Sequence, residues 1–593
     1  MAFLKYITQS IIVSVSLLGV GHCLAQTPEL TLKQKMFREV LKEKQLLHEG
    51  VGKEGNALQE LTKTTNTDER LTTGNGSDQE AEVSVIYKPT DSSKLIISFM
   101  DQTTIGLTFP IYYSSNGGQT WTKSTFNTTT ILQADFPGQT LDGGGDPAFA
   151  WDKNGRVYFS WIYLTSNATN DSSFFSLNWA YSDNNGVTWS VQPGKNHFIG
   201  QGAFDQSGNI LNYFDGVTDR EWLSVDNSGG AHQGRLYCSF VCFPANNASI
   251  FEGLKYKDAN SNSFGPMSTV YNNASQFGNV EVDKNGIVNV SYADMSANEI
   301  RHSSSADGGA TFSSSNLISS ATDLMHQSGP FVIHNRENGA PNLAVDGAAT
   351  LHIVWTDFVG GMTTSFYSRS SNGGITWSTP KTLDSFVTNK QSFMPTIAAN
   401  GNNVAISFTG INYTFDTALY YQINSTNNGR TFNAAKLLSS SPTNYAYYLS
   451  NGGNSGNYFF GDYNRSVRSL CNTYAAWSDG RINLGPKIYF AKTNYCSIGI
   501  KEVTEVNATI QLSAVYPNPA TDKITLEMVS TQTQNVSISL TNINGQKILT
   551  QKAVLHSGDQ HIVIPLNKLP AGTYILSVND NKTTIATRQV SIY

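Results

Sequence analysis

The chain has 593 residues, a net charge of −6 and an isoelectric point near 5.9, and only 14% of its residues are charged. This acidic balance excludes the broad basic face that nucleic-acid binding requires. The length suits one large fold with appendages, and the 50 glycines and many aromatic residues predict an all-β protein with tight turns.

Residues 1–25 have the pattern of a secretory signal peptide. Lys5 precedes an apolar run from Ile11 to Val20, and small residues around Ala25 predict cleavage before Gln26. We expect no transmembrane helix, because no later apolar run approaches the ~20 residues that a span needs. The mature protein is therefore predicted to be secreted or held at the cell surface.

Residues 26–78 are predicted to be a helical leader followed by a linker. Residues 28–48 indicate an amphipathic helix, because their apolar side chains fall near one face with Lys and Glu between them. Residues 49–78 are rich in Gly, Thr and Asn and are expected to connect this helix to the next domain.

Residues 79–498 repeat at about 60-residue intervals. Each unit has a strand ending in Asp or Asn, then Gly, then an aromatic-rich strand, as in residues 146–152 and 155–161. Seven such units predict a seven-bladed β-propeller, with six blades as the alternative if the end units share one. The last unit lacks an evident fourth strand, so we expect another part of the chain to supply it. A closed ring would also protect the sheet edges.

Five of the units contain the motif Ser-x-(Asp/Asn)-x-Gly-x-Thr-aromatic. The copies begin at Ser114, Ser182, Ser305, Ser370 and Ser425. The Asp or Asn side chain can bond amides of its own turn, and Gly supplies positive φ, so the motif predicts a hairpin tip. A decayed copy ends at Phe264, and the last unit has none.

This motif resembles the Asp-box, or bacterial neuraminidase repeat, of sialidase-like β-propellers. In that family the boxes are structural and lie on the rim away from the active site. The resemblance therefore implies that the boxes join the third and fourth strands on the bottom rim. It also implies that ligands are bound at the opposite, top end of the central funnel.

The cysteines divide into two pairs. Cys238 and Cys242 lie in one predicted strand, where four residues span about 13 Å, too far for a disulfide, which needs Cα atoms within about 7 Å. They are expected to be free, buried thiols. Cys471 and Cys496 flank a predicted hairpin at roughly opposite positions, and we predict that they form a disulfide.

A spacer at 499–512 leads to a small domain at 513–593, where alternating strands predict a β-sandwich. Three ordered motifs mark it, at Val515–Lys523, Asn542–Lys547 and Leu569–Tyr574. Together they resemble the C-terminal sorting domain of the type IX secretion system of Bacteroidota. The resemblance implies export across the outer membrane by that machinery, followed by release or surface attachment.

The propeller geometry also sorts the candidate site residues. An aromatic-x-Asp pattern recurs after second strands, which favours a structural turn role for its aspartates: Asp101, Asp294, Asp357 and Asp479. The residues that do not recur are the functional candidates. They are Asp219, Arg220, Glu221, Asp462, Tyr463 and Arg481.

The sialidase resemblance implies three roles. Three arginines would bind the substrate carboxylate, a Tyr activated by a Glu would attack the sugar, and an Asp would serve as general acid and base. Tyr463, Glu221 and Asp219 would fill the last two roles. Arg220 and Arg481, with Arg301 or Arg336, would form the clamp. However, the Arg-Ile-Pro motif of sialidases is missing, and no arginine lies between positions 70 and 156.

Two alternatives to the hydrolase remain open. One is a calcium-supported propeller, because Asp142 and Asp146 are hard oxygen ligands in a Gly-rich loop, although no cofactor is required. The other is an adhesin-like propeller that binds carbohydrate or protein through aromatic residues such as those of 444–448. Three arginines meeting beside a Tyr–Glu pair would favour the hydrolase. Aspartates with few arginines would favour a binding or metal-bearing propeller.

Overall fold

The computed structural model describes residues 68–72, 79–103, 106–167, 173–204, 210–211, 217–244, 249–273, 275–324, 339–387, 391–450, 458–482, 485–495, 509–542, 546–566, 569–580 and 584–592. It divides the chain into two compact units, with the boundary between Thr493 and Asn494. The predicted signal peptide and the helix predicted at 28–48 lie outside the described residues.

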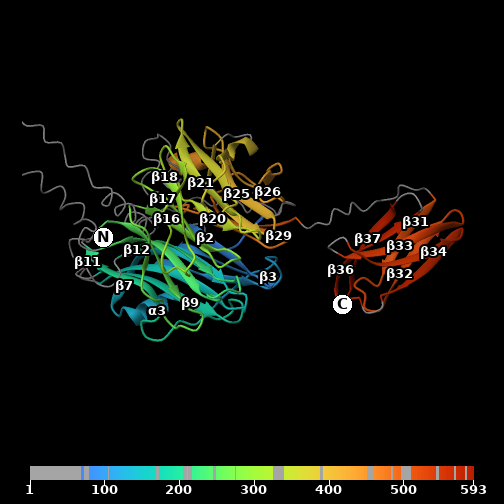
Figure 1. Ribbon diagram of the computed structural model, residues 1–593, viewed down its shortest axis with the longest axis horizontal. Helices are drawn as coiled ribbons and strands as arrows, with labels where there is room; N and C mark the ends of the chain where they lie inside the picture. The colour runs from blue at the N-terminus through green and yellow to red at the C-terminus, as the bar shows by residue number, and fades with distance from the viewer. Residues whose placement is uncertain are drawn as a thin grey trace, which may run out of the picture. The chain divides into compact units, whose positions relative to one another are not determined.

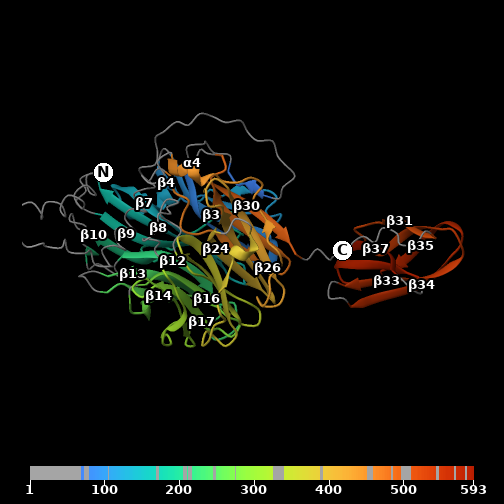
Figure 2. The ribbon, with the colours of Figure 1, turned by 90° about the horizontal axis from the view of Figure 1, so that it is seen from above.

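The first unit is a ring of seven β-sheets in the described part of the chain, which confirms the seven-bladed propeller (Figures 1 and 2). Blade 1 consists of β2 (Gln79–Lys88), β3 (Asp91–Thr103), β4 (Gly106–Thr108), β5 (Ile111–Ser114) and β6 (Thr122–Lys123). Blade 2 consists of β7 (Gln139–Trp151), β8 (Val157–Asn167), β9 (Ser173–Ser182), β10 (Phe198–Phe204) and β11 (Ile210–Leu211). Blade 3 consists of β12 (Val217–Val225), β13 (Leu236–Phe243), β14 (Phe251–Lys257) and β15 (Ser268–Tyr271).

The later blades keep the four-stranded antiparallel pattern. Blade 4 consists of β16 (Ser275–Val282), β17 (Val288–Asp294), β18 (Glu299–Ser305) and β19 (Asn316–Ser320). Blade 5 consists of β20 (Asn342–Val345), β21 (Leu351–Val359), β22 (Met362–Ser370) and β23 (Lys381–Thr382). Blade 6 consists of β24 (Gln391–Asn400), β25 (Asn403–Ile411), β26 (Ala418–Ser425) and β27 (Lys436–Leu437).

Blade 7 joins the two ends of the propeller. It consists of β28 (Arg465–Arg468), β29 (Asn472–Asp479), β30 (Lys487–Asn494) and β1 (Asp68–Arg70). The fourth strand is thus supplied from elsewhere in the chain, as predicted, through pairs such as Asp68 with Ala491. This corrects the predicted boundary, because the propeller includes residues 68–70, which we assigned to the linker. Three polar residues show no alternation that would mark them as a strand.

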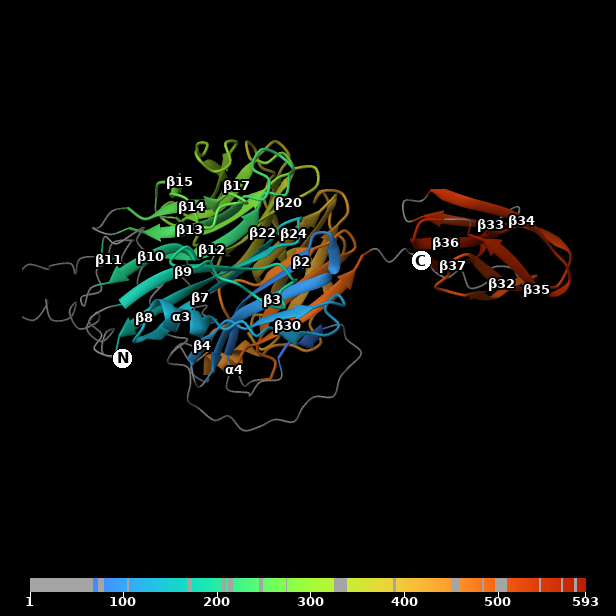
Figure 3. The same ribbon diagram turned by 90° about the horizontal axis from the view of Figure 1, so that it is seen from below.

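The seven first strands contact one another around a closed ring, from β2 through β7, β12, β16, β20, β24 and β28 back to β2. Figure 3 shows the same ring from below, with blue β3 beside orange β30 where the ring closes. Within the described residues, three short helices lie in connections: α3 (Thr128–Asp135), η2 (Asp384–Phe386) and α4 (Tyr445–Ser450). Buried aromatic residues, including Trp161, Trp179, Trp355 and Trp477, fill the layers between sheets.

All five boxes form the same hydrogen-bonded turn between the third and fourth strands. In the box of blade 5, the Ser370 hydroxyl accepts from the Gly374 amide and donates to Asn372 Oδ1, at 2.9 and 2.8 Å. Asn372 Oδ1 also accepts from the Thr376 amide at 3.0 Å. These three bonds recur in the other four boxes at 2.7–3.0 Å. The predicted hairpin tip is therefore correct.

Each box also packs against the preceding blade through its second glycine position. At Gly118, whose φ is +86°, an added Cβ would lie 2.5 Å from the Phe490 ring of blade 7. The equivalent glycines face the preceding blade in the same way: Gly186 faces Ile96, Gly309 faces Leu254, Gly374 faces His302 and Gly429 faces Tyr367. Glycine is needed here for its positive φ and for its lack of a side chain. The boxes therefore hold neighbouring blades together.

Two of the recurring aspartates cap their own turns, as predicted. Asp294 accepts from the amides of Ser296 and Ala297, and Asp479 accepts from the amide of Arg481. Asp357 instead accepts from the amides of Thr322 and Asp323, in the connection that leads from blade 4 to blade 5. Such bonds satisfy backbone donors outside the strands.

The described cysteines of the first unit differ in whether they form a disulfide. Cys238 and Cys242 are free and buried on β13. Cys471 is disulfide-bonded, whereas Cys496, its predicted partner, lies outside the described residues.

The second unit is a two-sheet β-sandwich. One sheet has the order β31 (Ile510–Tyr516), β32 (Lys523–Ser530), β35 (Gly558–Pro565). The other has the order β34 (Lys547–Leu555), β33 (Gln534–Asn542), β36 (Gly572–Asn579), β37 (Thr584–Ile592). Alternate residues of β32 are buried, and Ile524, Leu526 and Met528 contribute to one core with residues of the second sheet. The sandwich begins at Ile510, slightly before the predicted 513.

Candidate functional site

Five of the seven inner strands contain a bulge, in blades 1, 2, 3, 4 and 6. The strand register shifts next to one residue with positive φ: Glu82 in β2, Asp146 in β7, Arg220 in β12, Phe277 in β16 and Met394 in β24. A bulge leaves a residue out of the strand pairing and re-aims its side chain, and non-glycine residues adopt this conformation at some cost. The same irregularity therefore recurs at one level around the channel.

An open cavity of about 520 Å³, counting the solvent-filled space at its mouth, lies at this level. Blades 3 to 7 line it, through Arg220, Glu221, Trp222, Phe277, Gly278, Asn279, Ala340, Pro341, Asn342, Met394, Pro395, Asp462, Tyr463 and Asn464. We call it the mouth cavity. Side chains of this level also join blades: Asn279 Oδ1 accepts from the Leu343 amide at 3.0 Å and Asn342 Oδ1 from the Ile397 amide at 2.8 Å.

Arg220 crosses the mouth cavity from blade 3. Its Nη2 lies 2.6 Å from Asp462 Oδ2, and its Nη1 lies 4.0 Å from Asp146 Oδ1. The guanidinium also lies over two rings, with Cζ 4.5 Å from the centre of Phe277 and 5.3 Å from that of Tyr463. The backbone amide of Asp146 in turn donates a hydrogen bond to Glu82 Oε2, at 3.2 Å. This arginine is thus held by carboxylates of the protein itself.

A second arginine, which does not line the cavity, extends from blade 7 to blade 3, in the opposite direction. Arg465 of blade 7 places its Cζ 3.9 Å from the centre of the Trp222 ring of blade 3. Burial lowers the pKa of Arg465 to about 10, and the nearby Glu281 carboxylate opposes this shift. Burial raises the pKa of Glu281 to about 7, against the effects of Arg465, Trp222 and Ser224. Blades 3 and 7 are therefore joined by two arginines: Arg220 reaches from blade 3 to Asp462, and Arg465 reaches from blade 7 to Trp222.

Tyr463 has the wrong electrostatic surroundings for a nucleophile. Burial raises the pKa of its phenol well above the usual value, and the Asp146, Glu82 and Glu221 carboxylates raise it further, whereas Arg220 lowers it. A phenol that attacks a sugar must give up its proton readily. The Trp222 ring meets Tyr463 edge-on, with 6.2 Å between the ring centres, so the two rings form an aromatic wall.

Most of the predicted site residues meet here. Arg220, Glu221, Asp462 and Tyr463 line the mouth cavity, and Asp219 is fully buried beside them on β12. Residues that the sequence analysis missed are Glu82, Trp222, Phe277, Glu281, Met394 and Arg465. Trp222 directly follows the predicted triplet, and the repeated start of each inner strand is the signal that could have identified the others.

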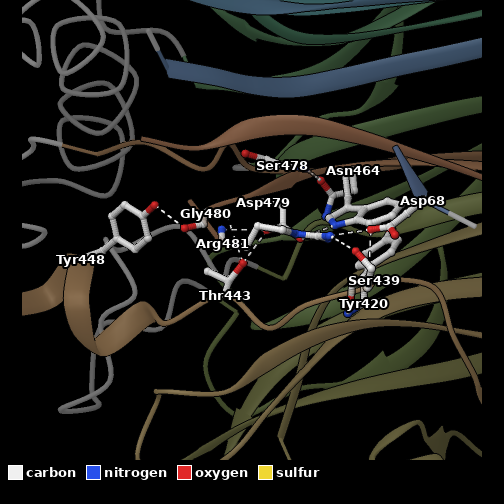
Figure 4. A network of polar contacts seen from close by, with 12 residues as sticks. Asp68, Tyr420, Ser439, Thr443, Tyr448, Asn464, Ser478, Asp479, Gly480 and Arg481 are labelled. Atoms are coloured by element: carbon white, nitrogen blue, oxygen red, sulfur yellow. Dashed lines mark hydrogen bonds and ion pairs between the residues drawn. The ribbon is translucent and has the colours of Figure 1, made fainter. Parts of the chain in front are cut away.

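Arg481 is the exception, and its predicted clamp role is wrong. It does not line the mouth cavity but pins the last strand of blade 7 (Figure 4). Its Nη1 lies 2.6 Å from Asp68 Oδ2 of β1, and its Nη2 lies 2.6 Å from Asp479 Oδ2. Arg481 lowers the pKa of Asp479, against the effect of burial. The side chain is therefore used to close the ring.

The other predicted clamp and metal residues do not complete a site. Arg301 lies 2.6 Å from Glu299 on β18 and does not line the mouth cavity, and Arg336 lies outside the described residues. Among the residues that the structure describes, no three His, Cys, Asp or Glu side chains are grouped to hold a metal ion. Asp146 faces the Arg220 cation, which would repel calcium, and the Asp142 side chain is not described.

The comparisons with protein families identify two parts of the chain. Residues 112–123 match the BNR/Asp-box repeat, and residues 514–592 match the secretion system C-terminal sorting domain. The protein is therefore an Asp-box β-propeller with a type IX sorting domain. This domain directs secretion through the type IX system to the cell surface or beyond. No helix in the described ranges has the length and apolar character to cross a bilayer.

No curated protein sequence matches the chain. Similar solved structures include a protein of unknown function from Dyadobacter fermentans, with 13% identity, a TM-score of 0.38, and coverage of 58% of this chain and 94% of the other. The intramolecular trans-sialidase from Ruminococcus gnavus has 11% identity, a TM-score of 0.36, and coverage of 70% and 94%. An α-L-arabinanase from Penicillium chrysogenum has 12% identity, a TM-score of 0.37, and coverage of 73% and 99%. Likenesses this remote do not bear on function.

Proposed function

We propose that the protein is a secreted carbohydrate-binding propeller whose ligand occupies the mouth cavity. The observation that carries this proposal is the lining of that cavity, in which aromatic rings stand beside carboxylates at the open end of the channel. Sugar rings pack against aromatic faces. The partly exposed rings of Trp222 and Tyr463 would supply this contact.

The same lining disfavours sialoside hydrolysis. Among the described residues that line the cavity, Arg220 is the single arginine, and Asp462 and Asp146 already hold it. A sialic acid carboxylate would have to compete with those two carboxylates, whereas a sialidase clamp presents three arginines. The raised pKa of Tyr463 also opposes its use as a nucleophile.

A glycan array, followed by calorimetry with the ligands it identifies, tests the proposal. We expect binding by the secreted protein and at least tenfold weaker binding by Trp222→Ala, because the variant loses the ring that forms one wall. Ile375→Ala, at a 72% exposed box residue, is the control and is expected to bind normally. Thermal melting of each variant separates loss of binding from loss of folding.

Release of 4-methylumbelliferone from its sialoside distinguishes binding from hydrolysis. We expect no turnover. Sustained turnover that is lost in Tyr463→Phe would overturn the proposal in favour of the hydrolase. No binding to any glycan, by a protein that melts cooperatively, would also overturn it.

A further inference from the structure

A second pocket opens between blades 2 and 3, at the end of the blades that carries the boxes. It has a volume of about 760 Å³, counting the open space at its mouth, and we call it the rim pocket. Arg156 and Tyr158 of blade 2 line it, together with Ala259 and Asn260 of blade 3. Ala259 and Asn260 belong to the decayed box at 257–264, so the pocket opens where an intact box is missing.

The decayed box has lost the residues that form the box turn. Aligned on its final Phe with the intact box of blade 4, Ser305–Phe312, it has Lys257, Ala259 and Ser261 in place of the Ser, the Asp and the second Gly. Lys257 Nζ and the Ser261 amide instead both donate to the carbonyl oxygen of Asp258, at 3.0 and 2.9 Å. Blade 3 therefore has no glycine at the position through which each intact box packs against the preceding blade.

The interface between blades 3 and 4 shows what an intact box supplies. Arg235 directly precedes β13, pairs with Asp258 through Nε at 2.8 Å, and lies over the Tyr256 ring with Cζ 4.0 Å from its centre. Its Nη1 donates to the carbonyl oxygen of Gly308 in the box of blade 4, at 2.7 Å. A guanidinium that is held by its own blade thus binds a backbone carbonyl of the next blade.

Arg156 is the equivalent residue of blade 2. It directly precedes β8, its Nε lies 2.7 Å from Asp183 Oδ1, and its Cζ lies 4.3 Å from the centre of the Tyr181 ring. Among the described residues, however, no hydrogen bond joins Arg156 to the box of blade 3, and Asn260, at the position of Gly308, lines the rim pocket. Because the Arg156 side chain is 35% exposed, a ligand in the pocket can reach it.

Tyr158 marks the place of the missing glycine. The equivalent Tyr237 of blade 3 packs against the box of blade 4, where a Cβ added at Gly309 would lie 3.2 Å from its ring. Tyr158 lines the rim pocket instead. Burial and the Asp152 carboxylate raise the pKa of Tyr158 to about 12, while Arg156 lowers it. The hydroxyl therefore keeps its proton near neutral pH and is able to donate a hydrogen bond.

The charges that line the rim pocket balance. They are two cations and two carboxylates: Lys88, Arg156, Asp152 and Asp183. Arg156 pairs with Asp183, Lys88 Nζ donates to a box side chain at 3.0 Å, and Asp152 Oδ1 accepts from a backbone amide at 2.9 Å. Lys257 adds a buried cation behind the lining, and it donates to a backbone carbonyl. Such a lining suits a neutral ligand that offers hydrogen-bond acceptors and donors.

We infer that the rim pocket binds a peptide turn of a partner protein, in the way that blade 3 binds the box of blade 4. A backbone carbonyl of the turn accepts from Arg156, and a glycine of the turn packs on Tyr158. A peptide is favoured over a sugar, because a Gly-Gly turn fills the equivalent space in the next interface. This partner site goes beyond the proposed function, and it is separate from the mouth cavity, so both can be occupied together.

The test uses the full secreted protein and a blocked peptide with the sequence of residues 305–312. A second peptide carries Gly308→Ala and Gly309→Ala. Titrations followed by saturation-transfer NMR compare their affinities, and we expect the first peptide to bind at least fivefold more tightly, because methyl groups on the turn would clash with the pocket wall.

Variants of the protein then assign the binding to the rim pocket. Arg156→Met is expected to weaken it at least fivefold through loss of the bond to the carbonyl, and Asn260→Trp is expected to block it by filling the pocket. Lys153→Met is the control, because it removes an exposed cation from the turn before Arg156 without changing the pocket lining. Thermal melting verifies that each variant folds.

Four outcomes would overturn the inference. The first is no binding of the peptide by a protein that melts cooperatively. The second is binding that Arg156→Met and Asn260→Trp both leave unchanged. The third is loss of peptide binding in Trp222→Ala, which would place the peptide in the mouth cavity. The fourth is tighter binding of N-acetylglucosamine than of the peptide, blocked by Asn260→Trp, which would assign the pocket to a sugar amide.

Discussion

The box turns and the mouth cavity lie at opposite ends of the same blades, and they are built in opposite ways. The five boxes repeat one hydrogen-bonding network with distances that differ by a few tenths of an ångström. At the mouth, the equivalent residues of blades 1 to 4 and blade 6 all differ: Glu82, Asp146, Arg220, Phe277 and Met394. The backbone bulge is retained while the side chain changes.

This difference separates stability from recognition. A box glycine must fit against the neighbouring blade, so nearly the same turn is needed at each interface. The bulge residues are buried beside the channel, and each of these blades presents a different side chain there. Changes at the boxes should therefore affect folding and spare the ligand, and changes at the mouth should affect the ligand more than the fold.

The largest expected effect is on the box side of this comparison. Gly374→Ala would place a Cβ in clashing distance of the His302 ring at a φ of +83°, so we expect a loss of at least about 3 kcal/mol in unfolding free energy. The adjacent Gly373→Ala is the matched control, because its φ is +69° but nothing lies within 4 Å, and it should cost only about 1 kcal/mol. Urea unfolding followed by tryptophan fluorescence measures both. Equal losses would show that the glycine contact does not join the blades.

A second prediction concerns the one mouth residue that also supports the fold. Arg220→Met leaves buried carboxylates without their shared cation, so we expect a loss of about 3 kcal/mol in unfolding free energy. Arg156→Met removes an ion pair of similar length whose side chains are 35% and 59% exposed, and it should change stability by less than about 1 kcal/mol. The same urea experiment compares them, and equal effects would contradict the structural role of Arg220.

The third prediction is that stability depends on pH through Glu252, a buried carboxyl group behind the mouth cavity. Glu252 is fully buried behind the cavity wall, near Gly278, and burial raises its pKa from 4.5 to about 8. The folded state therefore keeps a proton that the unfolded chain releases, and stability should fall as pH rises from about 4.5 through 8. Glu252→Gln should match the wild type near pH 5 and exceed it by about 2 kcal/mol or more at pH 8. Parallel pH profiles of the melting temperature would refute this assignment.

The repeated parts of the fold could be predicted from the sequence because they depend on local chemistry. A Ser, an Asx and a Gly at fixed spacing define the box turn, and the alternating apolar residues of β32 define a sandwich strand. β1 could not be predicted, since Asp68, Glu69 and Arg70 show no periodicity and gain their structure only by pairing with β30. Its strand is a consequence of closing the ring.

The site was predicted in part. Asp219 to Glu221 and Asp462 to Tyr463 stood out as departures from the repeat, and four of these five line the cavity. Phe277 and Met394 were missed because an apolar residue near the start of an inner strand does not stand out from the core pattern, and their repeated position was the only signal. Arg481 was misassigned because an Asp-Gly-Arg turn has the same sequence whether its arginine binds a ligand or Asp68. Only the fold decides which residues meet.

Closing the ring through β1 also sets an order of events in folding. Asp68 pairs with Ala491, about 420 positions later, so this contact is among the most distant in the propeller. Bringing such remote segments together costs roughly 5 kcal/mol of chain entropy before any bond forms. Until then β30 offers an unpaired edge to any other strand. A newly made or translocating copy can therefore pair wrongly with other strands until its last blade has formed. The Asp68–Arg481 ion pair then holds β1 in place on that blade.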